Sequence, residues 1–199
     1  MASDVQIANR ALSKLGQERI ISFADNTKAA RAITSCYDDL RQAELRAYRW
    51  QFCYKRVALP ALADAPAFGF TAAYQLPADY LRLDLVDDRY PSAMLDSYVD
   101  TDLAEYVLEG NTILTNIAAP LRIRYGADIT DAAQWDPLFR EMFACRLAVD
   151  LCETLTQSNT KGQQIRADYA EARRQAYRAG AIERPPASLP DGAWIIGRL

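Results

Sequence analysis

Carboxylates offer the widest choice of chemistry in this sequence of 199 residues. The chain contains 26 Asp and Glu residues and no histidine, which excludes Ser-His and Cys-His nucleophilic pairs and the commonest metal ligand. Two carboxyl groups, one with a raised pKa and one ionised, would suit hydrolysis of a glycosidic bond. The candidates for such a pair are Glu44, Asp79, Asp87, Glu105 and Glu141. Spacing alone does not bring two of them together, and the alternative is that they are solvated or cap helices.

Two pairs of adjacent aspartates are the best candidates for a cation site, Asp38-Asp39 and Asp87-Asp88. Calcium needs six or more oxygen ligands from an organised loop, and the sequence has no DxDxDG pattern. Surface charge is therefore the preferred interpretation of both pairs. The sequence also has neither GxxxxGK[ST] nor GxGxxG, so it indicates no phosphate-binding loop and we predict no cofactor.

The stretch 46–56 combines aromatic rings and cations. Its members are Trp50, Phe52 and Tyr54, which alternate, and Arg46, Arg49, Lys55 and Arg56. Rings beside arginines can stack on the bases of a single-stranded nucleic acid. Aromatic clusters are most often buried, however, so a hydrophobic junction between helices and strands is the preferred interpretation.

The composition is typical of a soluble globular protein, with 50% apolar and 25% charged residues. The net charge of -3 gives no overall positive field to attract nucleic acid, although this value averages over faces of opposite sign. No run of eighteen apolar residues occurs, and MASDVQIANR does not resemble a signal peptide, so we expect folding in a cytoplasm. The cysteines form no CxxC pair and are expected to be reduced and near the core, with a disulfide or zinc site as the alternative. They are Cys36, Cys53, Cys145 and Cys152.

Apolar residues at helical spacing predict two helices in the first part of the chain. The first covers 4–15 and stops at Gly16, a residue that commonly ends a helix. The second covers 27–48 and carries Arg41 on its polar face. Its predicted apolar face comprises Ala29, Ile33, Cys36, Leu40, Ala43 and Ala47.

Helical spacing disappears after Trp50, where prolines recur. EYVLEGNTILTN predicts a hairpin that turns at Gly110, and LRIRYG alternates like a half-solvated strand. Helix returns at Pro137 with so many apolar residues that we expect this helix to be buried on most sides. QSNTKG predicts a turn, and a last helix follows over 162–179.

The predicted fold is mainly α with a β insert, in the α+β class: a four-helix bundle, a small antiparallel β-subdomain and an extended C-terminal arm. Residues 1–49 and 136–181 would form the bundle, 50–135 the inserted β-subdomain and 182–199 the arm. Apolar residues on such an arm either fold back on the bundle or dock on another chain, and the sequence leaves both open.

Several short motifs follow one another along nearly the whole chain. They are Leu15-Gly16, Tyr37-x-x-x-Arg41, Trp50-x-Phe52, Leu76-Pro77-x-Asp79-Tyr80, Tyr125, Asp136-Pro137-x-Phe139 and Leu147-Ala148. In this order the motifs resemble the head-to-tail adaptor proteins of short-tailed phages, the tail tubular protein A family. The resemblance implies a structural virion protein without enzymatic activity or cofactor, assembled in the host cytoplasm and located in the tail.

The same resemblance implies the partners of the chain. A family member is monomeric until it meets the portal protein, then forms a dodecameric ring that extends the DNA channel and receives the tail nozzle, a protein of the tail tubular protein B type. Genomic DNA would pass without specific binding, and an acidic chain suits this because few phosphate contacts mean weak binding.

Two sets of interface residues follow as hypotheses. The portal interface would use Arg184 and the apolar anchors of the arm, Trp194, Ile195, Ile196 and Leu199. The tail-nozzle interface would use Tyr80, Arg82, Asp87, Arg89 and Tyr90, within the stretch YQLPADYLRLDLVDDRYP. The alternative functions are a tail-associated cell-wall glycosidase that uses a carboxylate pair, and a cytoplasmic protein-binding module with no phage role.

Overall fold

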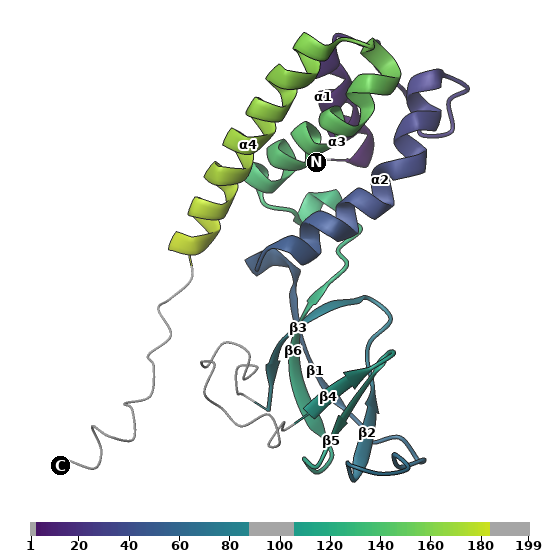
Figure 1. The fold of residues 1–199 in the computed structure, drawn as a ribbon, viewed down its shortest axis with the longest axis vertical. Coiled ribbons are helices and arrows are strands. Elements are labelled where there is room, and N and C mark those ends of the chain that lie inside the picture. The colour runs from purple at the N-terminus through teal and green to yellow at the C-terminus, as the bar shows by residue number, and fades with distance from the viewer. Residues whose placement is uncertain (1–2, 88–105, 184–199) are drawn as a thin grey trace, which may run out of the picture.

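The structure, a computed structural model, describes residues 3–87 and 106–183 of the chain. Helices occupy one end of the molecule and strands the other (Figure 1). The helices are α1 (Asp4–Leu15), α2 (Lys28–Ala47), α3 (Pro137–Thr156) and α4 (Asn159–Ile182). The strands are β1 (Tyr54–Leu59), β2 (Ala72–Gln75), β3 (Tyr80–Val86), β4 (Tyr106–Glu109), β5 (Thr112–Thr115) and β6 (Leu121–Ala127). The fold is therefore of the α+β class, as predicted.

α1 has the bounds that the sequence predicts, because both of its ends are capped locally. The Ser3 hydroxyl accepts a hydrogen bond from the Gln6 amide, and the Gln6 side chain accepts one from the Ser3 amide. Gly16 ends the helix at φ 72°, in the left-handed region that glycine adopts without strain. The buried face comprises Ile7, Ala8, Ala11, Leu12 and Leu15.

α2 is rotated relative to the prediction. Ala43 and Ala47 are exposed, whereas Arg41, predicted on the polar face, is buried. The buried face comprises Ala30, Ile33, Tyr37, Leu40, Arg41, Glu44 and Leu45. The predicted face was right for Ile33 and Leu40, which are buried, and for Ala29 and Cys36, which pack against the core. It was wrong for Ala43 and Ala47 because Arg41 and Glu44 turn inward to distant partners, Asp128 and Arg146, and periodicity counts only apolar residues.

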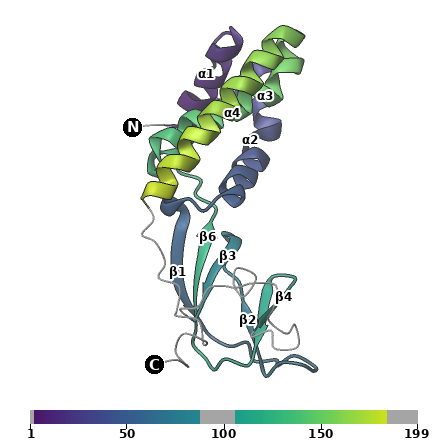
Figure 2. The same cartoon turned by 60° about the vertical axis from the view of Figure 1, so that its left-hand side comes forward.

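α3 is the central helix, and it packs against α1, α2 and α4. Figure 2 shows α4 lying across α3, with α1 and α2 to either side. The Asp136 carboxylate accepts hydrogen bonds from the Leu138 and Phe139 amides, and Pro137 occupies the first turn, so the predicted start is confirmed. Phe139, Met142 and most other apolar residues of α3 are buried, which confirms that this helix is covered on most sides.

α4 begins earlier than predicted. Gln157 adopts φ 53° and reverses the chain within two residues, so the sequence predicted as a turn already forms helix from Asn159. Ser158 caps this helix, since its hydroxyl accepts a hydrogen bond from the Lys161 amide. Of its residues only Ile165 and Ala176 are fully buried, so α4 presents much of its surface outward.

The strands form two antiparallel sheets of three strands each, in the orders β1-β6-β3 and β2-β5-β4. β4 and β5 form the predicted hairpin, with Gly110 at φ 57° in its turn. β6 alternates as predicted: Leu121, Ile123 and Tyr125 are buried, whereas the arginines between them face outward. β3 pairs with β6 through two register irregularities, which bring neighbouring β3 residues opposite one β6 residue.

An aromatic junction joins the helices to the sheets. The Trp50 ring is 3% exposed, its indole N–H donates to the Glu44 carbonyl at 2.9 Å, and its centroid lies 4.8 Å from that of Phe139. Tyr48 stacks on Tyr177 of α4 with the ring centroids 4.2 Å apart. The stretch 46–56 therefore contributes a hydrophobic junction, and its rings are not a base-stacking platform.

One cluster of buried residues runs from the helices through this junction into the strands. The predicted division into a bundle, a β-subdomain and an arm stays a prediction, and α4 continues to Ile182 where the arm was expected to begin. All four cysteines are free, three buried and Cys36 half-buried, as expected. No described helix is long and apolar enough to span a lipid bilayer.

Candidate functional site

The predicted tail-nozzle residues that the structure describes lie on β3 or directly after it. Tyr80 is half-buried, with its ring centroid 6.2 Å from that of Tyr125. The Arg82 guanidinium donates to the Tyr54 hydroxyl at 3.1 Å. Asp87, at φ 46°, places its carboxylate 3.9 Å from the Arg122 Nε atom.

The remaining predicted interface residues lie outside the described residues. They are Arg89 and Tyr90 of the nozzle set and Arg184, Trp194, Ile195, Ile196 and Leu199 of the portal set. Both interfaces therefore stay predictions.

A buried carboxylate organises the outer face of the β1-β6-β3 sheet. Asp84 on β3 is 1% exposed, and its carboxylate accepts hydrogen bonds from the Tyr54 hydroxyl at 3.0 Å and from Arg124 Nε at 2.5 Å. Arg49 Nε lies 3.6 Å from the same carboxylate. The hydrogen bonds from Arg124 and Tyr54 and the nearby charge of Arg49 compensate the cost of burying this carboxylate. Asp84 therefore fixes the Arg124 side chain in place.

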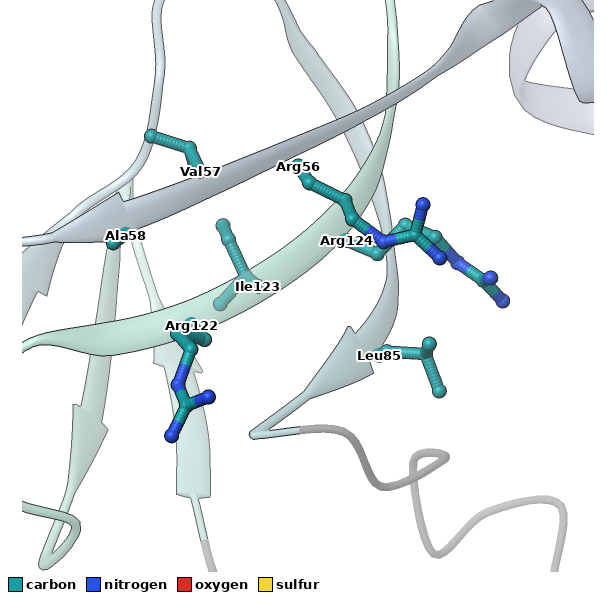
Figure 3. Close-up of a pocket in the computed structure, with 7 residues that line it drawn as sticks. All are labelled: Arg56, Val57, Ala58, Leu85, Arg122, Ile123 and Arg124. Atoms are coloured by element: carbon teal, nitrogen blue, oxygen red, sulfur yellow. The ribbon is translucent and has the colours of Figure 1, made fainter.

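Further arginines lie on this face of the sheet. Arg56 of β1 lies directly opposite Arg124 of β6. Arg122 lies on the same strand as Arg124, two residues before it in the sequence. Together with Val57, Ala58, Leu85 and Ile123 these three arginines line a hollow of about 290 Å³. The Arg56 and Arg124 side chains extend to the same side of the sheet, as Leu85 does (Figure 3). We call the set Arg49, Arg56, Arg82, Arg122 and Arg124 the arginine face.

Arg82 is half-buried among the other members of this face. Its guanidinium carbon lies 5.6 Å from the centroid of the Tyr54 ring, and that of Arg124 lies 5.1 Å from the same centroid. Burial lowers the pKa of Arg82, and the charge of Arg49 lowers it further. Within the described residues, Arg82 Nε is buried without a hydrogen-bond partner. This one nitrogen of Arg82 is therefore held away from solvent and from the acceptors around it.

The carboxylates considered for a catalytic pair lie beside cations. Glu44 accepts from the Tyr169 hydroxyl at 2.7 Å and lies 3.3 Å from Arg146 Nε. Glu141 joins α3 to α1, with its carboxylate 2.9 Å from Arg10 Nε and 2.7 Å from Lys14 Nζ. Burial alone would raise the pKa of Glu141, but these two partners lower it below its ordinary value.

Asp79 lies in a similar environment on the sheet. Its carboxylate accepts from Lys55 Nζ at 2.6 Å and from the Tyr125 hydroxyl at 2.9 Å. Asp87 lies near Arg122, as described above, and Glu105 lies outside the described residues. Each described candidate therefore has a cation as its close partner. A general acid needs a raised pKa, whereas the pKa values of Asp79 and Glu141 are lowered.

The adjacent aspartates do not gather further ligands. Asp38 forms an ion pair with Arg41 on the same helix, and Asp88 lies outside the described residues. Among residues 3–87 and 106–183, no group of three or more Cys, Asp or Glu side chains is arranged to hold a metal ion.

The arginine face is not apparent from the sequence. Arg49 and Arg56 belong to the aromatic stretch 46–56, whereas Arg122 and Arg124 belong to the alternating segment LRIRYG, and no local signal joins the two segments. The pairing of β1 with β6 puts Arg56 opposite Arg124, and this register depends on strands far apart in the sequence. The signal in hindsight is the alternation of arginine in LRIRYG.

The motifs that carry the family resemblance lie at points that hold the fold together. Tyr37 donates its hydroxyl to Asp4 at 3.1 Å, and burial with this contact raises its pKa. Arg41 binds Asp128 through two guanidinium nitrogens, at 2.9 and 3.0 Å. The other motif residues include the helix end at Gly16, the junction at Trp50, the Asp79–Tyr125 contact and the helix start at Asp136.

No protein-family model matches this chain, and no curated protein matches it significantly.

Proposed function

We propose that this chain is a structural virion protein, a head-to-tail adaptor that forms a ring between a portal and a tail nozzle and extends the DNA channel. One observation carries the proposal: the ordered motifs that resemble the adaptor family coincide with caps, buried ion pairs and the helix–sheet junction. Residues in such positions determine how the chain folds. We expect the members of a family of ring subunits to share a fold rather than a catalytic site.

In this proposal the helices, the strands and the C-terminal arm contact different partners. In this proposal the helices that gather on α3 form a four-helix bundle that contacts neighbouring copies, and the β-subdomain faces the tail. The 182–199 arm engages the portal. α4 suits contact with a neighbour because only two of its residues are fully buried within the chain. An enzymatic role is less well supported, because Glu44, Asp79 and Glu141 are engaged by cations.

The proposal is tested by mixing the purified full chain with a portal ring from a short-tailed phage. We expect a larger complex on size-exclusion chromatography and an added ring layer in negative-stain images. A chain that remains monomeric beside portals from several such phages would refute the adaptor role.

Two variants in the same experiment test the arm. One deletes 184–199, and the other replaces Trp194, Ile195 and Ile196 by serine at full length. Loss of binding in both variants would support portal contact by the arm. Unchanged binding would show that the arm is not required, while the adaptor role would stand on the full-chain result.

A further inference from the structure

The arginine face is strongly positive on a chain whose net charge is negative. It has five arginines; within the described residues Arg49 and Arg124 lie beside Asp84 and Arg122 lies beside Asp87, and Arg49 and Arg122 make further interactions. Asp84 is buried beneath the face, where it neutralises part of the charge of Arg49 and Arg124. Arg56 has no ion-pair partner among the described residues and is exposed. A concentrated positive field therefore remains on the outer side of the sheet.

Folding alone does not account for this arrangement. Arg56 and Arg124 are direct cross-strand neighbours, and like charges in such a pair destabilise a sheet. A neutral side chain in place of Arg56 would remove this repulsion without unpairing any described group. A like-charged cross-strand pair that costs stability is better explained by an anionic partner that lies against it.

The geometry favours phosphate groups in a repeating chain. Arginine presents a planar fork that binds phosphate or carboxylate through two hydrogen bonds. Arg122 and Arg124 are two residues apart on one strand, about 6.8 Å, a separation similar to that of neighbouring phosphates along a nucleic-acid strand. An extended acidic peptide offers alternate carboxylates at the same spacing, so the test below compares the two partners directly.

The same structure excludes recognition of bases by the neighbouring rings. Trp50 is buried and Phe52 packs on Phe139 with the ring centroids 5.1 Å apart, so neither is available to stack. The Tyr54 ring already lies against two guanidinium groups. Contacts from this face would therefore be made to the backbone, which positions a nucleic acid without reading its sequence.

We propose that the arginine face binds the phosphodiester backbone of a nucleic acid, without base readout. The proposal deepens the adaptor role and rests on it only for the source of the nucleic acid, namely the genome that passes through the ring. It replaces the expectation, drawn from the net charge, that the chain makes few phosphate contacts. The binding itself is a property of this sheet and is measurable on the isolated chain.

The test is the salt dependence of binding between the full chain and a fluorescent oligonucleotide, single-stranded or duplex, measured by anisotropy. The variant R56Q/R122Q removes two charges at exposed positions and leaves the Asp84 contacts in place. Each lost phosphate contact should reduce the slope of log K against log salt by about 0.9 for a duplex and about 0.7 for a single strand, so the slope should fall by about 1.8 or about 1.4, respectively. The loss should be equal for oligonucleotides of different sequence.

The matched control is R166Q/R178Q, which removes two exposed charges from α4. Its slope should equal that of the unmodified chain. An equal fall in both double variants, or no salt-dependent binding by the unmodified chain at low salt, would overturn the proposal. Tighter binding of an acidic peptide than of the oligonucleotide at equal charge would also overturn it, in favour of a protein partner. None of these outcomes depends on ring formation with the portal.

Discussion

Asp84 shows how one buried charge can determine the surface above it. The Asp84 carboxylate is 1% exposed and has Tyr54, Arg49 and Arg124 as partners. Such a group contributes little net stability while it is paired, but removing it leaves cations desolvated without a counter-charge. The position of Arg124, and with it the arginine face, therefore depends on Asp84.

Replacement of Asp84 by alanine should lower the free energy of unfolding by about 3–5 kcal/mol, because the partners of a buried ion pair would be left uncompensated. Urea unfolding followed by circular dichroism measures this loss. The control is Asp64→Ala at an exposed position in the loop before β2, where we expect a change within about 0.5 kcal/mol. Equal losses in the two variants would contradict the role assigned to Asp84.

Asp79 is the residue whose protonation should affect stability in acid. Burial alone would raise the pKa of its carboxyl, but hydrogen bonds from Lys55 and Tyr125 outweigh burial and hold it below the ordinary value of 3.8. A carboxyl with a lowered pKa in the folded state contributes stability above pH 3.8, which is lost as the pH falls through the folded-state pKa.

We therefore expect Asp79→Asn to be less stable than the unmodified chain at pH 6 and the difference to shrink as the pH falls below 3.8. Urea unfolding at a series of pH values between 6 and about 2 gives this difference directly. Asp64→Asn, which removes one carboxylate at an exposed position, is the control for the loss of a charge. A difference between the Asp79 variant and the parent that stays constant down to the lowest pH would contradict the pKa shift.

Among the elements, helices were predicted best where their ends carry local signals. The caps at Ser3, Gly16 and Asp136 each act within a few residues, and they set the bounds of α1 and the start of α3. α4 was predicted too short because its start depends on Gln157, a residue with no special preference for the left-handed conformation that it adopts.

Replacement of two glycines by alanine should change the stability of the chain in opposite directions, because one glycine ends a helix and the other lies inside one. Gly16→Ala should destabilise the chain by about 1 kcal/mol, because an alanine at φ 72° is strained although it meets no atom within 4 Å. Gly162→Ala, inside α4, should stabilise by about 0.5–1 kcal/mol, since the added methyl would lie 3.8 Å from Cys152 Sγ, an ordinary contact. Thermal unfolding of both variants measures the two effects. A shift in the same direction for both would contradict this interpretation.

In the whole molecule, the junction couples the helical end to the sheet end. Trp50 packs on Phe139 and Tyr177, so it joins the chain before β1 to α3 and α4. The continuous core through this junction means that the arginine face is held in a defined position relative to the helices. An adaptor ring built through the helices would therefore present the arginine faces of all copies in the same orientation, which connects the two proposals.

Caps, turns and alternation are local, and they were enough to predict the class of the fold, the α1 helix, the β4–β5 hairpin and the alternation of β6. The inward turn of Arg41 and the assembly of the arginine face were not predictable in this way. Arg41 meets Asp128 across 87 positions, and Arg124 meets Asp84 across 40. A charged side chain is buried only where such a distant partner compensates its desolvation, so its environment becomes known only when the strands and helices are brought together.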